Sequence, residues 1–229
     1  MASESSTLRL VIRSIFWAVI LFALPFAGAG TFAWPEGWAY IIIQFSSWTV
    51  MTVWLKKNNP ELLQVRAEGW KRAVKPWDQV ILILLMAGIV ALFAFPGVDA
   101  VRYQWSHVPL SFKIIGFVGT ALSNALMFWV LVANPYSSAA VEVQRERGHK
   151  VITTGPYRYV RHPMYLGGIL MAISIPLALG SWLTFVPVTL LIAVVVARTY
   201  LEDATLHEEL EGYVAYAETV KYRLIPGIW

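Results

Sequence analysis

Cysteine and charged residues are what this sequence lacks most clearly. None of its 229 residues is a cysteine, which excludes disulfides, a thiolate nucleophile, cysteine-ligated zinc and iron–sulfur clusters. Only 14% of the residues are charged, against about 25% in a typical soluble domain. Because 58% are hydrophobic, lipid is the predicted main solvent of the chain. We expect neither nucleic acid nor a metal ion among its partners.

Long apolar runs predict an all-α integral membrane protein. A membrane-crossing helix needs about 20 apolar residues, and about six stretches qualify, the last two separated at Gly180-Ser181. This break predicts a tight helical hairpin, because one kinked helix over 163–200, the alternative, would far exceed a bilayer at ~1.5 Å per residue. The candidate spans are 10–32, 36–55, 78–97, 112–133, 163–180 and 182–200.

Basic residues are distributed unequally across these spans. With six spans and a cytoplasmic N-terminus, 16 of the 18 lysines and arginines fall in cytoplasmic segments, and only Arg102 and Lys113 fall outside. The positive-inside rule therefore places both termini in the cytoplasm. The cytoplasmic segments 56–77, 134–162 and 201–229 also hold nearly all candidate functional residues, so we expect any chemistry at this face.

Segment 56–77 combines basic residues with interfacial tryptophans. Lys71 and Arg72 lie between Trp70 and Trp77, a mixture that is typical of a helix lying on an anionic leaflet. We favour membrane anchoring over a role in gating lipid entry.

The stretch from Asn134 to Gly168 concentrates glycine, proline, tyrosine and basic residues just before a predicted span. Such backbone cannot face hydrocarbon, where its N–H and C=O groups would stay unsatisfied, so it folds over the protein or lines a polar cavity. Glycines allow close approach of a ligand, and tyrosines offer flat faces to a ring. Arg158, Arg161 and His162 can meet a carboxylate or hydroxyls. Each also has an ordinary interpretation as a headgroup contact or packing residue, but their combination favours a binding site.

A second polar cluster ends the last predicted span. Arg198 and Glu202 are four residues apart and share one face of a continuing helix. An ion pair that caps the span is the ordinary interpretation. In the functional interpretation Glu202 accepts from a cationic or amine group and Arg198 donates to an anionic one, at the depth where water meets lipid.

These residues resemble the isoprenylcysteine carboxyl methyltransferase (ICMT) family of membrane methyltransferases, in its bacterial branch. The resemblance covers Asn134 to Trp229, and it departs from the family pattern in having Asp203 where a second glutamate is usual and a shorter connection from Leu206 to Tyr213. It rests on Gly155-Pro-Tyr-Arg-Tyr-Val-Arg-His-Pro-Met-Tyr165, preceded by Gly148-His149 and followed by Arg198, Glu202-Asp203, Tyr213, Tyr216 and Arg223-Leu-Ile-Pro226.

The resemblance implies a cofactor pocket that opens to the cytosol and binds S-adenosylmethionine, with S-adenosylhomocysteine as product. It further implies that Arg198 binds the methyl acceptor and that Arg198 and Glu202 are the catalytic residues. The cofactor residues that match the family pattern are Glu142, His149, Lys150, Val151, Ile152, Tyr157, His162, Pro163, Met164, Tyr165 and Glu202.

We therefore expect one membrane domain, 1–229, in which four spans (1–133) precede a catalytic half (134–229). The predicted location is the bacterial inner membrane, and the predicted substrate is a lipophilic small molecule. Its methyl acceptor is left open between a prenylcysteine-like carboxylate, a lipid amine and a thiol, as is the oligomeric state. A carboxylate or thiolate needs little base assistance, whereas an amine must lose a proton, for example to Glu202, Glu208 or His162.

Two other classes of protein compete with this interpretation. A sterol-type membrane reductase would use NADPH, whose 2′-phosphate needs a basic cluster such as Arg145, Arg147 and Lys150. A non-enzymatic transporter would place polar residues near the bilayer midplane. The predicted spans offer few of these, chiefly Gln44, Ser123 and Asn124.

Overall fold

The computed structural model of the chain describes residues 22–73 and 75–229, and all regular structure in these ranges is helical. This confirms the all-α integral membrane protein predicted from the apolar runs. Of the predicted span at 10–32, residues 10–21 lie outside the described residues and 22–29 are helical. Within the described ranges, four helical stretches are long and apolar enough to cross a membrane, and a fifth apolar helix, α6 (Pro163–Leu179), is shorter. The four are α2 (Pro35–Asn58), α4 (Pro76–Gly97) continued by the π-helical turn η2 (Val98–Arg102), α5 (Leu110–Ala133) and α7 (Phe185–Glu209).

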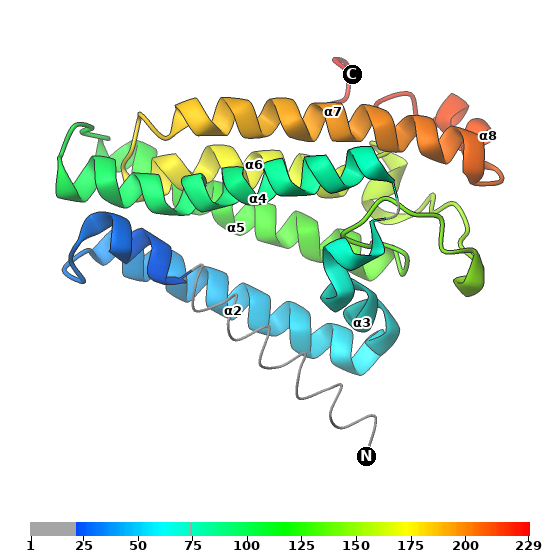
Figure 1. Cartoon of the computed structure of the whole chain (residues 1–229), viewed down its shortest axis with the longest axis horizontal. Helices are drawn as coiled ribbons and strands as arrows, with labels where there is room; N and C mark the ends of the chain where they lie inside the picture. Colours follow the sequence, from blue (N-terminus) through cyan, green and yellow to red (C-terminus); the bar gives the residue numbers. More distant parts are fainter. Residues whose placement is uncertain (1–21, 74) are drawn as a thin grey trace.

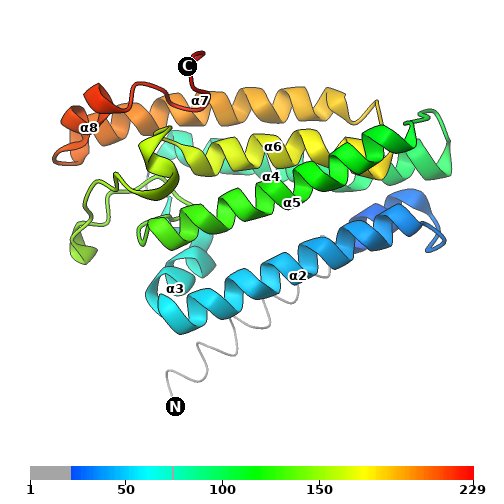
Figure 2. The same cartoon turned by 180° about the vertical axis from the view of Figure 1, so that it is seen from behind.

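Helices α4, α5, α6 and α7 lie side by side in a bundle (Figure 1). Helix α2 runs along one side of this bundle and inclines away from it toward the end that carries α3 (Pro60–Glu68), as both views show (Figure 2). Small residues let α5 and α6 approach closely, because a Cβ added at Gly116 would lie only 2.2 Å from the backbone nitrogen of Ala178. Ser123 of α5 also donates a hydrogen bond to the carbonyl of Gly167 at 2.7 Å.

The predicted hairpin is present as two separate antiparallel helices, α6 and α7 (Figure 1). Gly180 ends α6 with φ 84°, in the left-handed region where glycine carries no steric penalty. The backbone N–H of Ser181 then donates to the carbonyl of Pro176 at 2.8 Å. Helix α7 continues to Glu209, well beyond the end at residue 200 that hydropathy predicts, so Arg198 and Glu202 lie on one continuous helix.

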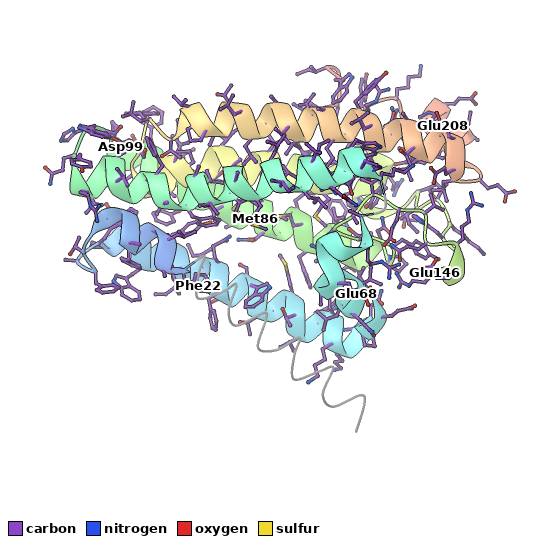
Figure 3. All side chains as sticks on the ribbon, in the orientation of Figure 1. Phe22, Glu68, Met86, Asp99, Glu146 and Glu208 are labelled. Atoms are coloured by element: carbon purple, nitrogen blue, oxygen red, sulfur yellow. The ribbon has the colours of Figure 1, made fainter. Side chains whose placement is uncertain are left out.

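Asp99 stabilises the turn between α6 and α7 from the end of the bundle opposite Glu68 and Glu146 (Figure 3). Its carboxylate is fully buried in the π-helical turn η2. One oxygen, Oδ2, accepts hydrogen bonds from the hydroxyls of Ser106 (2.6 Å) and Ser181. A single side chain therefore connects η2, the 103–109 loop and the hairpin.

Replacing Asp99 with alanine is expected to lower the free energy of unfolding by about 1–3 kcal/mol, because the buried hydroxyls lose their shared acceptor. Thermal unfolding in detergent measures this change. Asparagine at the same position keeps one acceptor oxygen and is expected to have a smaller effect. Since Asp99 lies at the end of the bundle opposite a cavity beside α3, the affinity of that cavity for ligands, measured well below the unfolding temperature, should not change. An alanine variant as stable as the wild type would contradict this role.

Segment 56–77 is bound to the rest of the protein more closely than a surface anchor would be. Leu62 of α3 is fully buried and packs with Leu55 and Leu131. Arg72, in the short helix η1 (Gly69–Arg72), contacts three carboxylates: Glu68 at 2.9 Å, Glu142 at 2.7 Å and Glu146 at 3.0 Å. Membrane anchoring, the role expected for this segment, did not include these ion pairs with the segment after α5.

Candidate functional site

A cavity of about 420 Å³ opens at the end of the bundle that carries α3 and α8 (Tyr213–Thr219). Its walls come from helices α3 to α8 and from the irregular segment between α5 and α6. This volume lies within the range of about 300–1,000 Å³ that is common for small-molecule sites. Every predicted cofactor residue except Pro163 lines the cavity, and so does Arg198.

The cavity has a polar part and an apolar part. Leu82, Leu85, Met86 and Ile89 recur at helical spacing and present one face of α4 to it. Met127 of α5 and Gly168 of α6 extend this apolar lining. The other walls combine further apolar residues, such as Val151 and Leu206, with carboxylates, guanidinium groups, imidazoles and phenols. The cavity therefore suits a ligand, or a pair of ligands, that has both polar and apolar parts.

The segment between α5 and α6 reaches the cavity through short 3-10 turns. Gly148 ends the first of these, η3 (Arg145–Arg147), with φ 61°, a conformation that favours glycine. The chain then places His149 in stacking contact with Tyr136, with ring centroids 4.4 Å apart. The backbone N–H of Gln144 donates to Nδ1 of His149 at 3.3 Å, so Nδ1 is the acceptor nitrogen of a neutral ring.

Burial lowers the pKa of His149 to about 4, and the nearby positive charge of Arg147 acts in the same direction. An unfolded histidine titrates near pH 6.5. Between these values the unfolded chain binds more protons than the folded chain, so the free energy of unfolding decreases as the pH falls from about 6.5 to 4. We expect the His149→Gln variant to lose less thermal stability than the wild type over this interval, measured by unfolding temperature at pH 7 and pH 4.5. Equal losses would contradict the assignment.

His162 lies at the start of α6, where Pro163 occupies the first helical position. Proline suits that position because it has no N–H to leave unsatisfied. Nε2 of His162 lies 3.1 Å from Oδ1 of Asp203, and its ring stacks on that of Tyr165 with centroids 5.9 Å apart. His162 and Tyr165 reach the cavity, whereas Pro163 is buried behind it and shapes the helix start.

Glu202 and Arg198 both face the cavity from α7, but they do not form the ion pair that their spacing allows. The hydroxyl of Tyr165 donates a hydrogen bond to Glu202. Arg198 instead contacts Asp78 of α4, with Nη2 2.9 Å from Oδ1 of that carboxylate, and lies over the ring of Tyr165. The ordinary interpretation, an Arg198–Glu202 cap, is therefore wrong, because each residue has a partner distant in sequence.

Asp203 connects several elements of the site, a role that the sequence did not indicate. In the sequence it stood out only as an aspartate where the family usually has a second glutamate. Only 1% of this residue is exposed. Its carboxylate accepts from Arg161 through Nε at 2.8 Å and Nη2 at 3.0 Å, from Nε of Arg223 at 2.8 Å and from the hydroxyl of Tyr213 at 2.9 Å. Burial, together with the charge of Asp203, raises the pKa of Tyr213 well above its ordinary value. Asp203 thus joins α7 to α8, to the start of α6 and to the C-terminal tail.

The C-terminal tail folds back onto the protein but does not cover the cavity. The backbone N–H groups of Arg161 and His162 donate to the carbonyls of Tyr222 and Arg223, both at 2.9 Å. Arg223 also lies over the ring of Tyr200 on α7. No residue beyond Tyr216 lines the cavity.

Arg66 and Asp78 are further site residues that the sequence did not indicate. Arg66 of α3 lines the cavity and donates to the carbonyl of Ser137 at 2.8 Å. Burial lowers its pKa below the ordinary value. Asp78 is the fully buried partner of Arg198. The signal available in the sequence for Asp78 was a carboxylate at the first residue of the predicted span 78–97, whereas Arg66 resembles any surface arginine in sequence.

Comparison with known proteins gives concordant matches. The family model described as "Isoprenylcysteine carboxyl methyltransferase (ICMT) family" matches residues 114–208, a range that includes Arg198 and Glu202. The chain is 25% identical over 153 residues to Protein-S-isoprenylcysteine O-methyltransferase B of Arabidopsis thaliana, covering 64% of this chain and 72% of that protein. The bacterial branch stays a prediction. Taken with the apolar helices, these matches support an ICMT-like methyltransferase of the membrane.

Proposed function

We propose that this protein transfers a methyl group from S-adenosylmethionine to the carboxylate of a lipophilic, prenylcysteine-like acceptor at the cytoplasmic face of its membrane. The observation that carries the proposal is the single cavity lined both by the predicted cofactor residues other than Pro163 and by Arg198. The name of the Arabidopsis relative favours a prenylcysteine carboxylate over an amine or a thiol. The excess of basic residues in the loops at this end favours the cytoplasmic face.

The donor set fits S-adenosylmethionine. The carboxylates of Glu142 and Glu202 complement its sulfonium, ammonium and ribose hydroxyl groups, and His162 complements its carboxylate. Tyr157 and the aliphatic Val151 offer surfaces for adenine. The predicted cofactor residues would therefore hold it, with Pro163 supporting His162 from behind. The bound cofactor supplies an activated methyl group on a positively charged sulfur.

The protein's own contribution is positioning. A carboxylate acceptor is already anionic at neutral pH, so no side chain has to remove a proton. Arg198 would orient this carboxylate, and the apolar lining of α4 would receive the lipophilic part of the molecule. Holding the two reactants together in one orientation accounts for the catalysis expected here.

Neither competing class has comparable support. Of the three basic residues proposed for an NADPH phosphate, only Lys150 lines the cavity. Nε of Arg147 is 2.8 Å from Glu61, and Arg145 is exposed to solvent. The polar residues expected of a transporter bond elsewhere in the protein: Asn124 donates to Gln44 at 2.6 Å and Ser123 to a backbone carbonyl.

The test uses the full chain purified in detergent. Isothermal titration with S-adenosylmethionine and with NADPH is expected to show binding of the first and none of the second. Methyl-labelled S-adenosylmethionine is then incubated with three acceptors: N-acetyl-S-farnesylcysteine, phosphatidylethanolamine and a long-chain thiol. We expect label in the farnesylcysteine as a base-labile ester. Absence of S-adenosylmethionine binding would refute the proposal, and label only in the amine or thiol would refute the choice of acceptor.

A further inference from the structure

Asp78 is a buried carboxylate whose hydrogen-bond partners all belong to the candidate site. It lies in the first turn of α4, and its side chain is fully buried. Removing a carboxylate from water is costly unless its oxygens are paired in good geometry. Here all the pairing comes from the candidate site, because its partners are Arg198 of α7 and the backbone of Val141.

These contacts form a closed ring. Oδ1 of Asp78 accepts from Nε of Arg198 at 3.0 Å and lies 2.9 Å from Nη2 of the same guanidinium. Oδ2 accepts from the backbone N–H of Val141 at 2.9 Å. Nη2 of Arg198 also donates to the carbonyl of Ala139 at 2.7 Å, which returns to the same short loop. Two helices and the loop that leads to Glu142 are therefore fixed to one another.

The ring occupies two of the three nitrogens of Arg198. Within the described part of the chain, Nη1 of this residue has no hydrogen-bond partner, yet it is not among the buried unpaired atoms. Since Arg198 lines the cavity, the two N–H groups of Nη1 are available to a ligand there. The guanidinium is further restricted by the ring of Tyr165, whose centroid lies 5.7 Å from its central carbon.

We infer that Asp78 is a positioning residue, which holds Nε and Nη2 of Arg198 so that Nη1 points at the carboxylate of the methyl acceptor. This inference rests on the proposed function, because it assigns Arg198 to the acceptor. An arginine released from Asp78 keeps its charge but loses its fixed direction. The acceptor should then bind less well, whereas the cofactor should bind as before.

Asp78→Asn is the informative variant, because an amide of the same size cannot accept from both Arg198 and Val141. We expect the KM for N-acetyl-S-farnesylcysteine to rise about tenfold, with a change in kcat of less than about threefold, since the loss is one charge-assisted contact. The Kd of S-adenosylmethionine, measured by calorimetry, should stay within about twofold. The matched control is Gln79→Ala, an exposed neighbour outside the cavity, which should leave all three values unchanged.

A double-mutant cycle separates positioning from a merely structural role. Lysine at position 198 keeps the charge but cannot make the two-nitrogen contact with Asp78. If Asp78 acts through Arg198, adding Asp78→Asn to Arg198→Lys raises the acceptor KM no further. If the Asp78→Asn protein does not fold, Arg198→Lys alone tests the same geometry, with the same rise in KM expected.

Several results would overturn the inference. The first is an acceptor KM that is unchanged in Asp78→Asn or, if that variant does not fold, in Arg198→Lys. The second is that the effects of the two substitutions on the acceptor KM are additive in the cycle. The third is that acceptor and cofactor binding weaken in parallel and the unfolding temperature falls. Failure of the proposed function is distinguishable, because it appears as a wild-type protein that transfers no methyl group to the farnesylcysteine.

Discussion

Replacing Glu202 with glutamine is expected to weaken S-adenosylmethionine binding by about 10- to 100-fold, because a charge-assisted contact contributes roughly 1.5–3 kcal/mol. Glutamine keeps the size of the side chain and can still accept from Tyr165, so the fold should persist. What it loses is the negative charge that, in the proposed function, faces a cationic cofactor. Calorimetry on the purified protein measures the change in Kd.

The matched control for Glu202→Gln is Glu211→Gln, which removes the same charge from an exposed residue beyond the end of α7. It should bind S-adenosylmethionine as the wild type does. An unfolding temperature close to the wild-type value is needed in both variants, so that affinity alone is compared. Wild-type affinity in Glu202→Gln would remove this residue from the cofactor site.

Asp203→Ala is expected to have the largest effect on stability, a loss of about 3–5 kcal/mol, because it leaves the buried guanidinium of Arg161 and the partly buried one of Arg223 without their counter-ion. Arg161 and Arg223 both depend on this carboxylate, as does the hydroxyl of Tyr213. The unfolding temperature in detergent and the yield of folded protein measure the loss. S-adenosylmethionine binding should fall with it, because His162 loses its contact at 3.1 Å.

A comparison with Glu218→Ala, at an exposed position on α8, controls for the removal of a negative charge. Asp203→Glu tests the reach of the side chain, since the extra methylene must be accommodated in a site that is almost fully buried. We expect it to fold but with reduced stability. If Asp203→Ala unfolds at the wild-type temperature, the joining role assigned to Asp203 is wrong.

The sequence predicted which residues line the site better than it predicted which residues contact one another. The stretch from Asn134 to Gly168 and the Arg198–Glu202 pair were singled out by their residue types, and the resemblance then indicated the cofactor residues. These cofactor residues, apart from Pro163, and Arg198 line one cavity. Their partners were predicted less well. Spacing along a helix suggests only partners three or four residues away, whereas Arg198 contacts a residue 120 positions earlier.

Burial was the second property that sequence reasoning missed. Segment 56–77 has the composition of a surface anchor, yet Leu62 is fully buried and Arg66 lines the cavity. Amphipathic segments that carry arginine can lie on a membrane or on protein, and composition does not separate the two. Nor did hydropathy locate the end of α7, because its last turns leave the apolar region while continuing as helix.

What the sequence determined by itself is the class of protein: apolar runs of about 20 residues indicate membrane-crossing helices, because a helix satisfies its backbone groups within its own segment in lipid. The break at Gly180-Ser181 also predicted a hairpin over a single kinked helix, because 163–200 as one helix is too long for a membrane. Only the tertiary structure decided which charges pair. Asp78 and Asp203 acquire their partners when α4, α7, α8 and the tail pack together. Each buried carboxylate needs a positively charged partner, because an unpaired buried charge would strongly destabilise the fold.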